Sequence, residues 1–250
     1  MKQKFKTFSL LFCALAMTAM CACTKDNNNP NNGGGNGGGN GGNNNTYNGH
    51  AYVDLGLPSG TLWATCNVGA ERPEDFGDYF AWGETTPKTT YDWSTYKFCN
   101  GPNEWGDYVL TKYCDNSAYG YNGYTDTLTI LLPEDDAATA NWGNGWRMPT
   151  GNDMVELYEN TTYRYHSMFN GVKGVLFTSK WNDNTLFLPH AGMIKDTTFF
   201  NGGYYYFNYW LSSNTTGDIQ AGVIGDYTWM MRCYGLSVRA VCSGTPNWPL

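Results

Sequence analysis

Charge is scarce in this sequence, and positive charge is the scarcer kind. Lys and Arg number 15 against 22 Asp and Glu, which gives a formal net charge of -7 over 250 residues. The sequence has no basic cluster that could follow a phosphate backbone, so a nucleic-acid partner is not expected. Asn, Gly, Tyr and Trp take the place of charged residues. This composition is typical of a protein outside the cytoplasm.

The N-terminal apolar run is too short to cross a bilayer. Phe8 to Met20 is apolar and follows Lys2, Lys4 and Lys6, which is the arrangement of a secretory signal rather than of a membrane span. We therefore expect residues 1–22 to be a lipoprotein signal peptide. Its removal leaves 12 basic against 22 acidic residues, and a net charge of -10.

The end of this segment resembles a bacterial lipobox. Signal peptidase II leaves a cysteine at the first mature position and favours a small residue before it. Cys23 follows Ala22, whereas the alternative Cys21 follows the bulkier Met20. We expect lipidation at Cys23, and acyl chains anchor stably because each buried methylene adds about 0.8 kcal/mol. A transmembrane anchor with ordinary cysteines is the alternative.

Residues 23–46 are expected to be the lipidated cysteine and a disordered linker. Eighteen of the nineteen residues 27–45 are Asn or Gly, which bury too little surface to fold. The Lys25–Asp26 pair resembles surface-export signals of Bacteroidetes lipoproteins. We expect a protein that is lipid-anchored in the outer membrane and exposed on the cell surface; the periplasm is the alternative location.

Residues 47–245 are expected to form a single α+β domain with two central helices. One begins at Pro133, whose following acids suit a first turn, and the other begins at Thr150, with one apolar face of Met154, Leu157 and Tyr158. Strand-like runs before and after the helices favour α+β over alternating βαβ units. These runs are 50–57, 61–70, 77–84, 174–179, 184–192, 204–213, 219–226, 228–233 and 236–242, and residues 100–126 are expected to be a loop.

A family resemblance supports this fold class. "GWRMPTGNDMVEL" (145–157) resembles the element before a helix in formylglycine-generating-enzyme-like and other C-type-lectin-like domains. Further stretches make the chain similar to the Fibrobacter succinogenes major paralogous domain family over most of residues 50–242. These are "VDLGLPSGTLWATCNVGA", "FGDYFAWGET", "LPEDDAATANWG", "LFLPHAG", "YWLSS" and "LSVRAV". The resemblance implies a C-type-lectin-like fold with paired N- and C-terminal strands and long loops on one side. It implies no activity.

We interpret "GWRMPT" as a structural corner rather than a site. Trp146 and Met148 should alternate into the core, and Pro149 should force Met148 out of helical geometry. Thr150 then starts a helix, with Asp153 at the capping-box position. Arg147 should be a structural hydrogen-bonding or ion-pair residue, and an acid of 134–136 is one candidate partner.

Several apparent metal sites are better explained by structure. Trp181-Asn182-Asp183 matches a triplet that helps ligate calcium in sugar-binding C-type lectins, but strands should flank it, and the partner Glu-Pro-Asn or Gln-Pro-Asp motif is missing. A hairpin turn is the expected structure. Cys233 and Cys242 lack the short spacing of the copper-binding pair in formylglycine-generating enzymes. His50, His166 and His190 are scattered, and a buried structural role is expected for His190.

No set of residues with a catalytic pattern emerges either. "WLSSN" lacks the G-x-S-x-G elbow, and Asp135 and Asp136 are explained by stabilisation of a helix N-terminus. We therefore expect no catalytic residue, metal or cofactor. After Cys23, five cysteines remain; we expect Cys99 to pair with Cys114 across the long loop, although all five could be reduced.

The abundance of aromatic residues favours binding. Trp, Tyr and Phe number 10, 19 and 12, more than a core of this size needs. Tyr119, Tyr121 and Tyr124 lie in a glycine-rich stretch, and Tyr205 lies in a second aromatic cluster at 200–210. Aromatic rings beside amides suit sugar recognition. We expect a non-enzymatic binding domain for a glycan or a surface protein. The alternatives are a subunit of a surface appendage and an enzyme of the sulfatase-modifying type.

Overall fold

A computed structural model of the chain describes residues 45–102, 107–201, 207–214, 219–225 and 228–244. The signal peptide, Cys23 and most of the linker lie outside these residues. Few helices and many short antiparallel strands make the fold α+β, as the sequence predicts. No helix in the described ranges combines the length and apolar character needed to span a membrane.

A five-stranded antiparallel sheet joins the two ends of the domain. Its order is β1-β2-β3-β15-β6. The strands are β1 (Thr46–Tyr47), β2 (His50–Val53), β3 (Thr61–Asn67), β15 (Arg239–Ser243) and β6 (Trp146–Arg147). Trp63 of β3 lies opposite Val241 of β15, so the N- and C-terminal strands pair as the family resemblance implies. β15 also pairs with β6, where Cys242 lies opposite Trp146.

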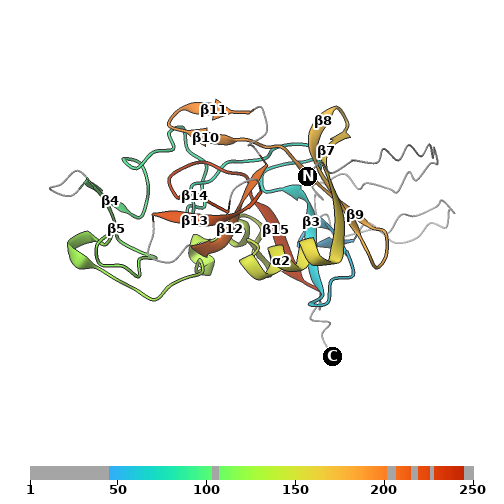
Figure 1. Cartoon of the computed structure of the whole chain (residues 1–250), viewed down its shortest axis with the longest axis horizontal. Coiled ribbons are helices and arrows are strands. Elements are labelled where there is room, and N and C mark those ends of the chain that lie inside the picture. Colours follow the sequence, from blue (N-terminus) through green and yellow to red (C-terminus); the bar gives the residue numbers. More distant parts are fainter. Residues whose placement is uncertain (1–44, 103–106, 202–206, 215–218, 226–227, 245–250) are drawn as a thin grey trace, which may run out of the picture.

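The other strands form four smaller antiparallel sheets around this one (Figure 1). Two sheets have three strands: β7 (Thr161–Phe169), β8 (Val172–Ser179) and β9 (Thr185–Pro189), then β12 (Asn208–Asn214), β13 (Gln220–Gly225) and β14 (Trp229–Met231). Two are hairpins: β4 (Cys99–Pro102) with β5 (Tyr108–Leu110), and β10 (Met193–Lys195) with β11 (Thr198–Phe200). In Figure 1, β4 and β5 lie at one end of the molecule and the β7–β8 hairpin lies at the other.

The helices are short and have clear sequence signals. The 3-10 turns are η1 (Tyr121–Gly123) and η2 (Pro133–Asp135), and the α-helices are α1 (Ala137–Trp142) and α2 (Gly151–Asn160). The predicted helix at 133–138 is thus split, because Asp136 has extended backbone and accepts a hydrogen bond from Thr139 N as the N-cap of α1. Thr150 caps α2 in a complete capping box with Asp153, which confirms that prediction.

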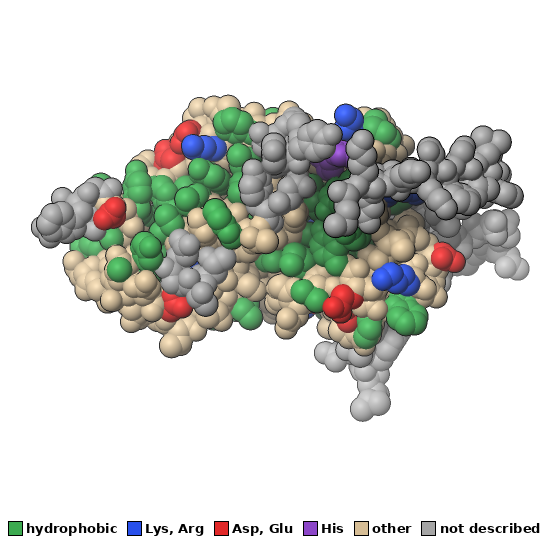
Figure 2. All heavy atoms as spheres, in the orientation of Figure 1, with side chains coloured by type: hydrophobic (Ala, Val, Ile, Leu, Met, Phe, Trp, Pro, Cys, Tyr) green, Lys and Arg blue, Asp and Glu red, His purple; other side chains and the backbone are tan. Residues whose placement is uncertain are grey.

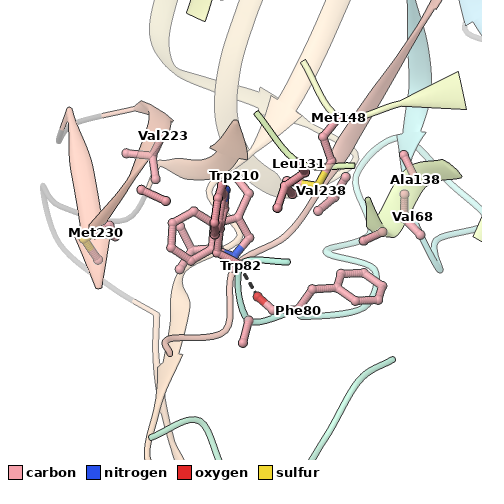
Figure 3. Packing of buried hydrophobic residues seen from close by; sticks show 14 of the residues in the cluster. Val68, Phe80, Trp82, Leu131, Ala138, Met148, Trp210, Val223, Met230 and Val238 are labelled. Atoms are coloured by element: carbon pink, nitrogen blue, oxygen red, sulfur yellow. Dashed lines mark hydrogen bonds between the residues drawn. The ribbon is translucent and has the colours of Figure 1, made fainter. Parts of the chain in front are cut away.

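The main sheet separates two hydrophobic clusters because its central strands alternate. Leu62 and Ala64 of β3 face the first cluster, whereas Trp63 faces the second. Trp82, Trp146 and Trp210 lie in the first cluster and are almost completely buried. Figure 3 shows Trp82 and Trp210 packed together, with the Trp210 indole donating to the Phe80 carbonyl at 2.7 Å. The second cluster packs α2 and the β7-β8-β9 sheet against the main sheet.

The predicted strand at 77–84 is wrong in detail. This segment makes only an isolated antiparallel bridge, between Phe80 and Leu236. Gly77 and Gly83 both have positive φ, at 69° and 78°, which strand residues do not adopt. The segment therefore crosses the core as a loop, and its backbone bonds to Val68, Leu236 and Arg232 in turn.

Two hairpins have weaker sequence signals than the other strands. β4 and β5 lie inside the stretch predicted to be a loop. β7 was not predicted as a strand, although Tyr163 and Tyr165 alternate with polar residues in 162–166. Residues 162–166 are all exposed, so no run of buried apolar residues marks this strand. Pairing with β8 decides its conformation.

Candidate functional site

The tyrosine loop (residues 115–126) carries the three predicted ligand-binding rings at the surface. Tyr119, Tyr121 and Tyr124 are 39%, 43% and 39% exposed. The loop follows the β4–β5 hairpin and lies at the same end of the molecule (Figure 1). In Figure 2, hydrophobic side chains outnumber charged ones over this end of the visible face. Exposed aromatic rings gathered on one loop suit a contact surface better than a solvated one.

A single carboxylate braces the base of this loop. Asp126 accepts hydrogen bonds from the backbone N–H groups of Tyr113 (2.7 Å), Cys114 (3.1 Å) and Leu128 (3.0 Å). It also accepts the Tyr124 hydroxyl at 3.0 Å. Both ends of the loop are thus fixed to one side chain, so the backbone of the loop and the Tyr124 side chain are held in place before any ligand arrives.

Local backbone geometry fixes the middle of the loop. Leu110 N donates to Tyr119 O at 2.7 Å, which docks the loop on β5. A Cβ on Gly120 would lie 1.8 Å from Tyr124 O, so only glycine fits there. Asn122 has φ 52°, in the left-handed region that Asn tolerates.

Several polar groups on the loop are free to bond a ligand. The Tyr119 and Tyr121 hydroxyls, the Asn122 amide and the Asn116 Nδ2 make no hydrogen bond with other described residues, whereas Asn116 Oδ1 accepts Ala118 N at 3.0 Å. Burial and the bond to Asp126 raise the pKa of Tyr124. The loop therefore combines ring faces with hydroxyl and amide groups. Tyr205, the fourth predicted ligand residue, lies outside the described residues, as does most of the 200–210 cluster.

The "GWRMPT" segment is a structural corner, as predicted. Trp146 is 1% exposed and donates its indole N–H to Tyr47 O at 3.0 Å. Met148 is buried, and the Pro149 carbonyl accepts Ser212 N at 2.8 Å, which links the corner to β12. Thr150 then caps α2.

Arg147 has a different partner from the candidate acids at 134–136. Its guanidinium bonds both carboxylate oxygens of Asp153, at 2.7 and 2.9 Å. Burial alone would raise the pKa of Asp153, but the bonds from Arg147 and Thr150 outweigh burial and lower it. One acid thus pairs with the corner's cation and completes the capping box of α2.

The acids at 135 and 136 are buried parts of the framework. Asp136 caps α1 and accepts Met148 N at 2.8 Å, and burial raises its pKa. Asp135 does not serve a helix terminus. It accepts Lys97 Nζ (2.7 Å), Lys112 Nζ (2.5 Å) and the Tyr113 hydroxyl (2.7 Å). Burial opposes this charge, but the two lysines and Tyr113 lower the pKa of Asp135 below its usual value.

Trp181, Asn182 and Asp183 form the predicted hairpin turn, between β8 and β9. Asp183 has φ 60°, and Asn182 Nδ2 donates to Asp54 O at 3.0 Å. Within the described ranges, no group of three or more His, Cys, Asp or Glu side chains has the arrangement of a metal site. His190 is half-buried and packs against His166, with ring centroids 5.5 Å apart.

The predicted Cys99–Cys114 disulfide is not present, because both thiols are free. Cys99 lies opposite Leu110 in the β4–β5 hairpin, and the Cys114 thiol donates to Asn116 O at 3.1 Å. Strand pairing and the Asp126 bonds close the loop instead.

Cys233 and Cys242 are also free and buried, and burial raises their pKa values to about 12 and about 11. Protonated thiols are poor copper ligands.

The cluster of Lys97, Lys112, Tyr113 and Asp135 was missed by sequence reasoning. The partners of Asp135 lie 22 to 38 residues before it, so no local spacing brings them together. Next to this cluster lies a pocket of about 310 Å³ lined by Glu84, Thr85, Thr86, Thr95 and Lys97. For the pocket, the sequence does contain a local signal: in "WGETTPK" (82–88) the acid Glu84 follows two core residues and precedes two threonines.

Comparison with known proteins gives no family assignment. No protein-family model matches the chain. No curated protein and no solved structure matches it either.

Proposed function

We propose that this chain is a non-enzymatic lipoprotein, lipidated at Cys23 and tethered to the cell surface, whose tyrosine loop binds a glycan. The observation that carries the proposal is the set of three exposed rings on a loop braced by Asp126. Ring faces stack on the apolar faces of sugars, and the free amides and hydroxyls of the loop bond sugar hydroxyls. The Fibrobacter succinogenes major paralogous domain family, and with it a C-type-lectin-like domain, remains our proposal for the ancestry of the fold.

Two features of the loop favour a glycan over a protein ligand. The exposed polar and aromatic groups of residues 116–124 are rings, hydroxyls and amides, and the charge of the loop is confined to Asp115 and Asp126 at its two ends. A protein interface of ordinary size needs roughly 800 Å² on each partner and a well-packed apolar centre. Three partly exposed rings on one loop match a short stretch of a sugar chain better.

The test is a glycan array with the full chain, purified in a detergent that has no sugar headgroup. The array identifies a ligand, and its affinity is then measured for wild type and for the Tyr119→Ala/Tyr121→Ala/Tyr124→Ala variant. Three lost stacking contacts of about 0.5–1.5 kcal/mol each predict a loss of at least tenfold in affinity. The melting temperature should barely change, because the rings are at the surface.

Tyr163→Ala is the matched control, since Tyr163 is 47% exposed but lies on β7 at the other end of the molecule. It should leave the affinity unchanged. An equal loss in both variants would show that the loop is not the site. Binding should also survive a calcium chelator, because Asn182 and Asp183 are engaged in a hairpin turn; loss of binding with chelator would restore the calcium site.

Assembly into a surface appendage has weaker support. β7 lies at the edge of its sheet, and residues 162–166 are exposed, so another strand could add there. However, the register shifts between Arg164 and Ser167, and His166 has φ 56°. Such an irregularity is a common protection against edge-to-edge pairing.

A further inference from the structure

The pocket beside the Asp135 cluster contains a buried carboxylate with one unused oxygen. Glu84 is only 8% exposed. Its Oε1 accepts Lys88 Nζ at 2.8 Å and Lys97 N at 2.9 Å. Its Oε2 accepts no hydrogen bond from the described residues, and it is not sealed from solvent. A buried carboxylate oxygen normally has a donor, so this one is available for a ligand.

The remaining walls of the pocket supply both donors and acceptors. The hydroxyls of Thr85 and Thr86 make no hydrogen bond with other described residues, whereas the Thr85 carbonyl accepts Asn141 Nδ2 at 3.0 Å. Lys97 Nζ gives one of its three N–H groups to Asp135 Oδ1 at 2.7 Å, which leaves the others free. The residues that line this pocket of about 310 Å³ thus carry an unused carboxylate oxygen, two hydroxyls and an ammonium group.

The charges around the pocket balance, which narrows the class of ligand. Lys88 and Lys97 pair with Glu84 and Asp135, and Lys112 pairs with Asp135 and Glu134. Three cations therefore face three acids, so neither an anion nor a cation is favoured. A neutral ligand with adjacent hydroxyl groups fits best, because it can donate to Glu84 while it accepts from Lys97.

A second pocket serves as a contrast. It has a volume of about 420 Å³ and is lined by residues of α2 together with Pro58 and Ser59. Three acids line it: Asp153 is paired with Arg147, Glu159 is exposed, and Glu156 has both oxygens occupied, by Ser59 N at 2.7 Å and Ser59 Oγ at 2.6 Å. Glu156 therefore has no unused oxygen comparable with Oε2 of Glu84.

We propose that the pocket of Glu84, Thr85, Thr86, Thr95 and Lys97 is a second carbohydrate site, which binds the adjacent hydroxyls of a neutral sugar residue. Oε2 of Glu84 accepts from one hydroxyl, and Lys97 Nζ donates to its neighbour. The residues of this pocket do not overlap with those of the tyrosine loop, so a negative result for the loop would not contradict the proposal for the pocket.

Amide NMR spectra of the full chain, in a detergent without a sugar headgroup, test this site. The probes are four neutral monosaccharides at millimolar concentration: glucose, galactose, mannose and N-acetylglucosamine. At least one should shift the amide signals of residues 84–86 and 95–97 in a saturable manner. Shifts confined to residues 116–124 would report the tyrosine loop alone and overturn the pocket proposal, as would no shift with any of the four sugars.

Two variants test the chemistry of the pocket. Glu84→Gln keeps the shape but removes the charge, and a hydrogen bond to a charged group predicts about a tenfold weaker affinity on its loss. Thr86→Val removes an exposed hydroxyl without disturbing the buried Glu84–Lys88 pair, so it should also weaken binding if Glu84→Gln fails to fold. Glu156→Gln, in the contrasting pocket, should bind like wild type. Wild-type affinity in Thr86→Val and in a folded Glu84→Gln would overturn the proposal.

Discussion

At the scale of single residues, buried polar atoms with specific partners fix the positions of large side chains. Trp146 illustrates this: its ring packs against Tyr47 and Trp142, while its indole N–H satisfies the carbonyl of Tyr47. The side chain thus connects β1, α1 and β6. Its replacement leaves a cavity and also an unsatisfied carbonyl.

We expect Trp146→Ala to lower the free energy of unfolding by roughly 3–5 kcal/mol, the usual range for deletion of a buried large aromatic. Denaturant-induced unfolding measures this change. Trp181→Ala is the control, because Trp181 is 66% exposed and should cost less than about 1 kcal/mol. Equal stability of wild type and Trp146→Ala would contradict the burial of this ring and the structural-corner interpretation.

At the scale of elements, the start of α2 depends on one carboxylate. Asp153 accepts Thr150 N (2.7 Å), the Thr150 hydroxyl (2.6 Å) and both arms of Arg147. The Asp153 carboxylate therefore holds Arg147, the last residue of β6, and also caps the first turn of α2. Its loss should affect two elements at once.

The pKa of Asp153 is lowered on folding, so its contribution to stability is complete above the ordinary carboxyl range and is lost as the pH falls through the folded value. We expect Asp153→Asn to lower the free energy of unfolding by about 1–3 kcal/mol at pH 7, discounted for the partial exposure of Arg147. The difference from wild type should shrink as the pH falls below about 4, where Asp153 of the unfolded chain begins to protonate, and should go on shrinking until the pH passes the lowered pKa of folded Asp153. Unfolding curves at pH 7 and pH 3 measure this. A difference that does not change with pH would contradict the ion pair; Glu159→Gln, an exposed acid on the same helix, is the control.

At the scale of the whole molecule, the tether and the tyrosine loop are expected to cooperate. From composition alone, we expect a linker of about twenty Asn and Gly residues to have a root-mean-square span of about 25 Å. With the proposed lipid at Cys23, we expect a tether of that length to let the loops of the domain reach ligands at the cell surface.

We expect Cys23→Ala to release the protein from the membrane fraction, whereas Cys21→Ala stays attached, because only Cys23 follows a small residue. Immunoblots of soluble and membrane fractions measure this. The opposite pattern would move lipidation to Cys21. Protease added to intact cells should remove the domain, and complete protection of the domain would place it in the periplasm.

Local patterns predicted the features whose interactions are themselves local. The capping box of Thr150 and Asp153, the apolar face of α2 and the turn at Asn182 and Asp183 all involve residues within four positions of each other. The antiparallel strand runs near both termini were also recognisable, because buried strands carry dense apolar sequence. Fold class therefore followed from the sequence.

Interactions between distant residues decided what sequence patterns could not. The choice of Asp153 over residues 134–136 as the partner of Arg147 depends on how the corner turns in space. The free thiols of Cys99 and Cys114 reflect a hairpin and an Asp126 network that make a disulfide unnecessary for closing the loop. Likewise, Glu84 and Lys97 meet beside Asp135, which lies 38 residues beyond Lys97, because core packing overrides separation along the chain. The sequence by itself determined the fold class, both helices and the strands with dense apolar runs, because these depend on neighbouring residues. Tertiary structure alone decided the pairing of β4, β5 and β7, which charges pair and which carboxylate oxygen stays unused, because these depend on residues far apart in the chain.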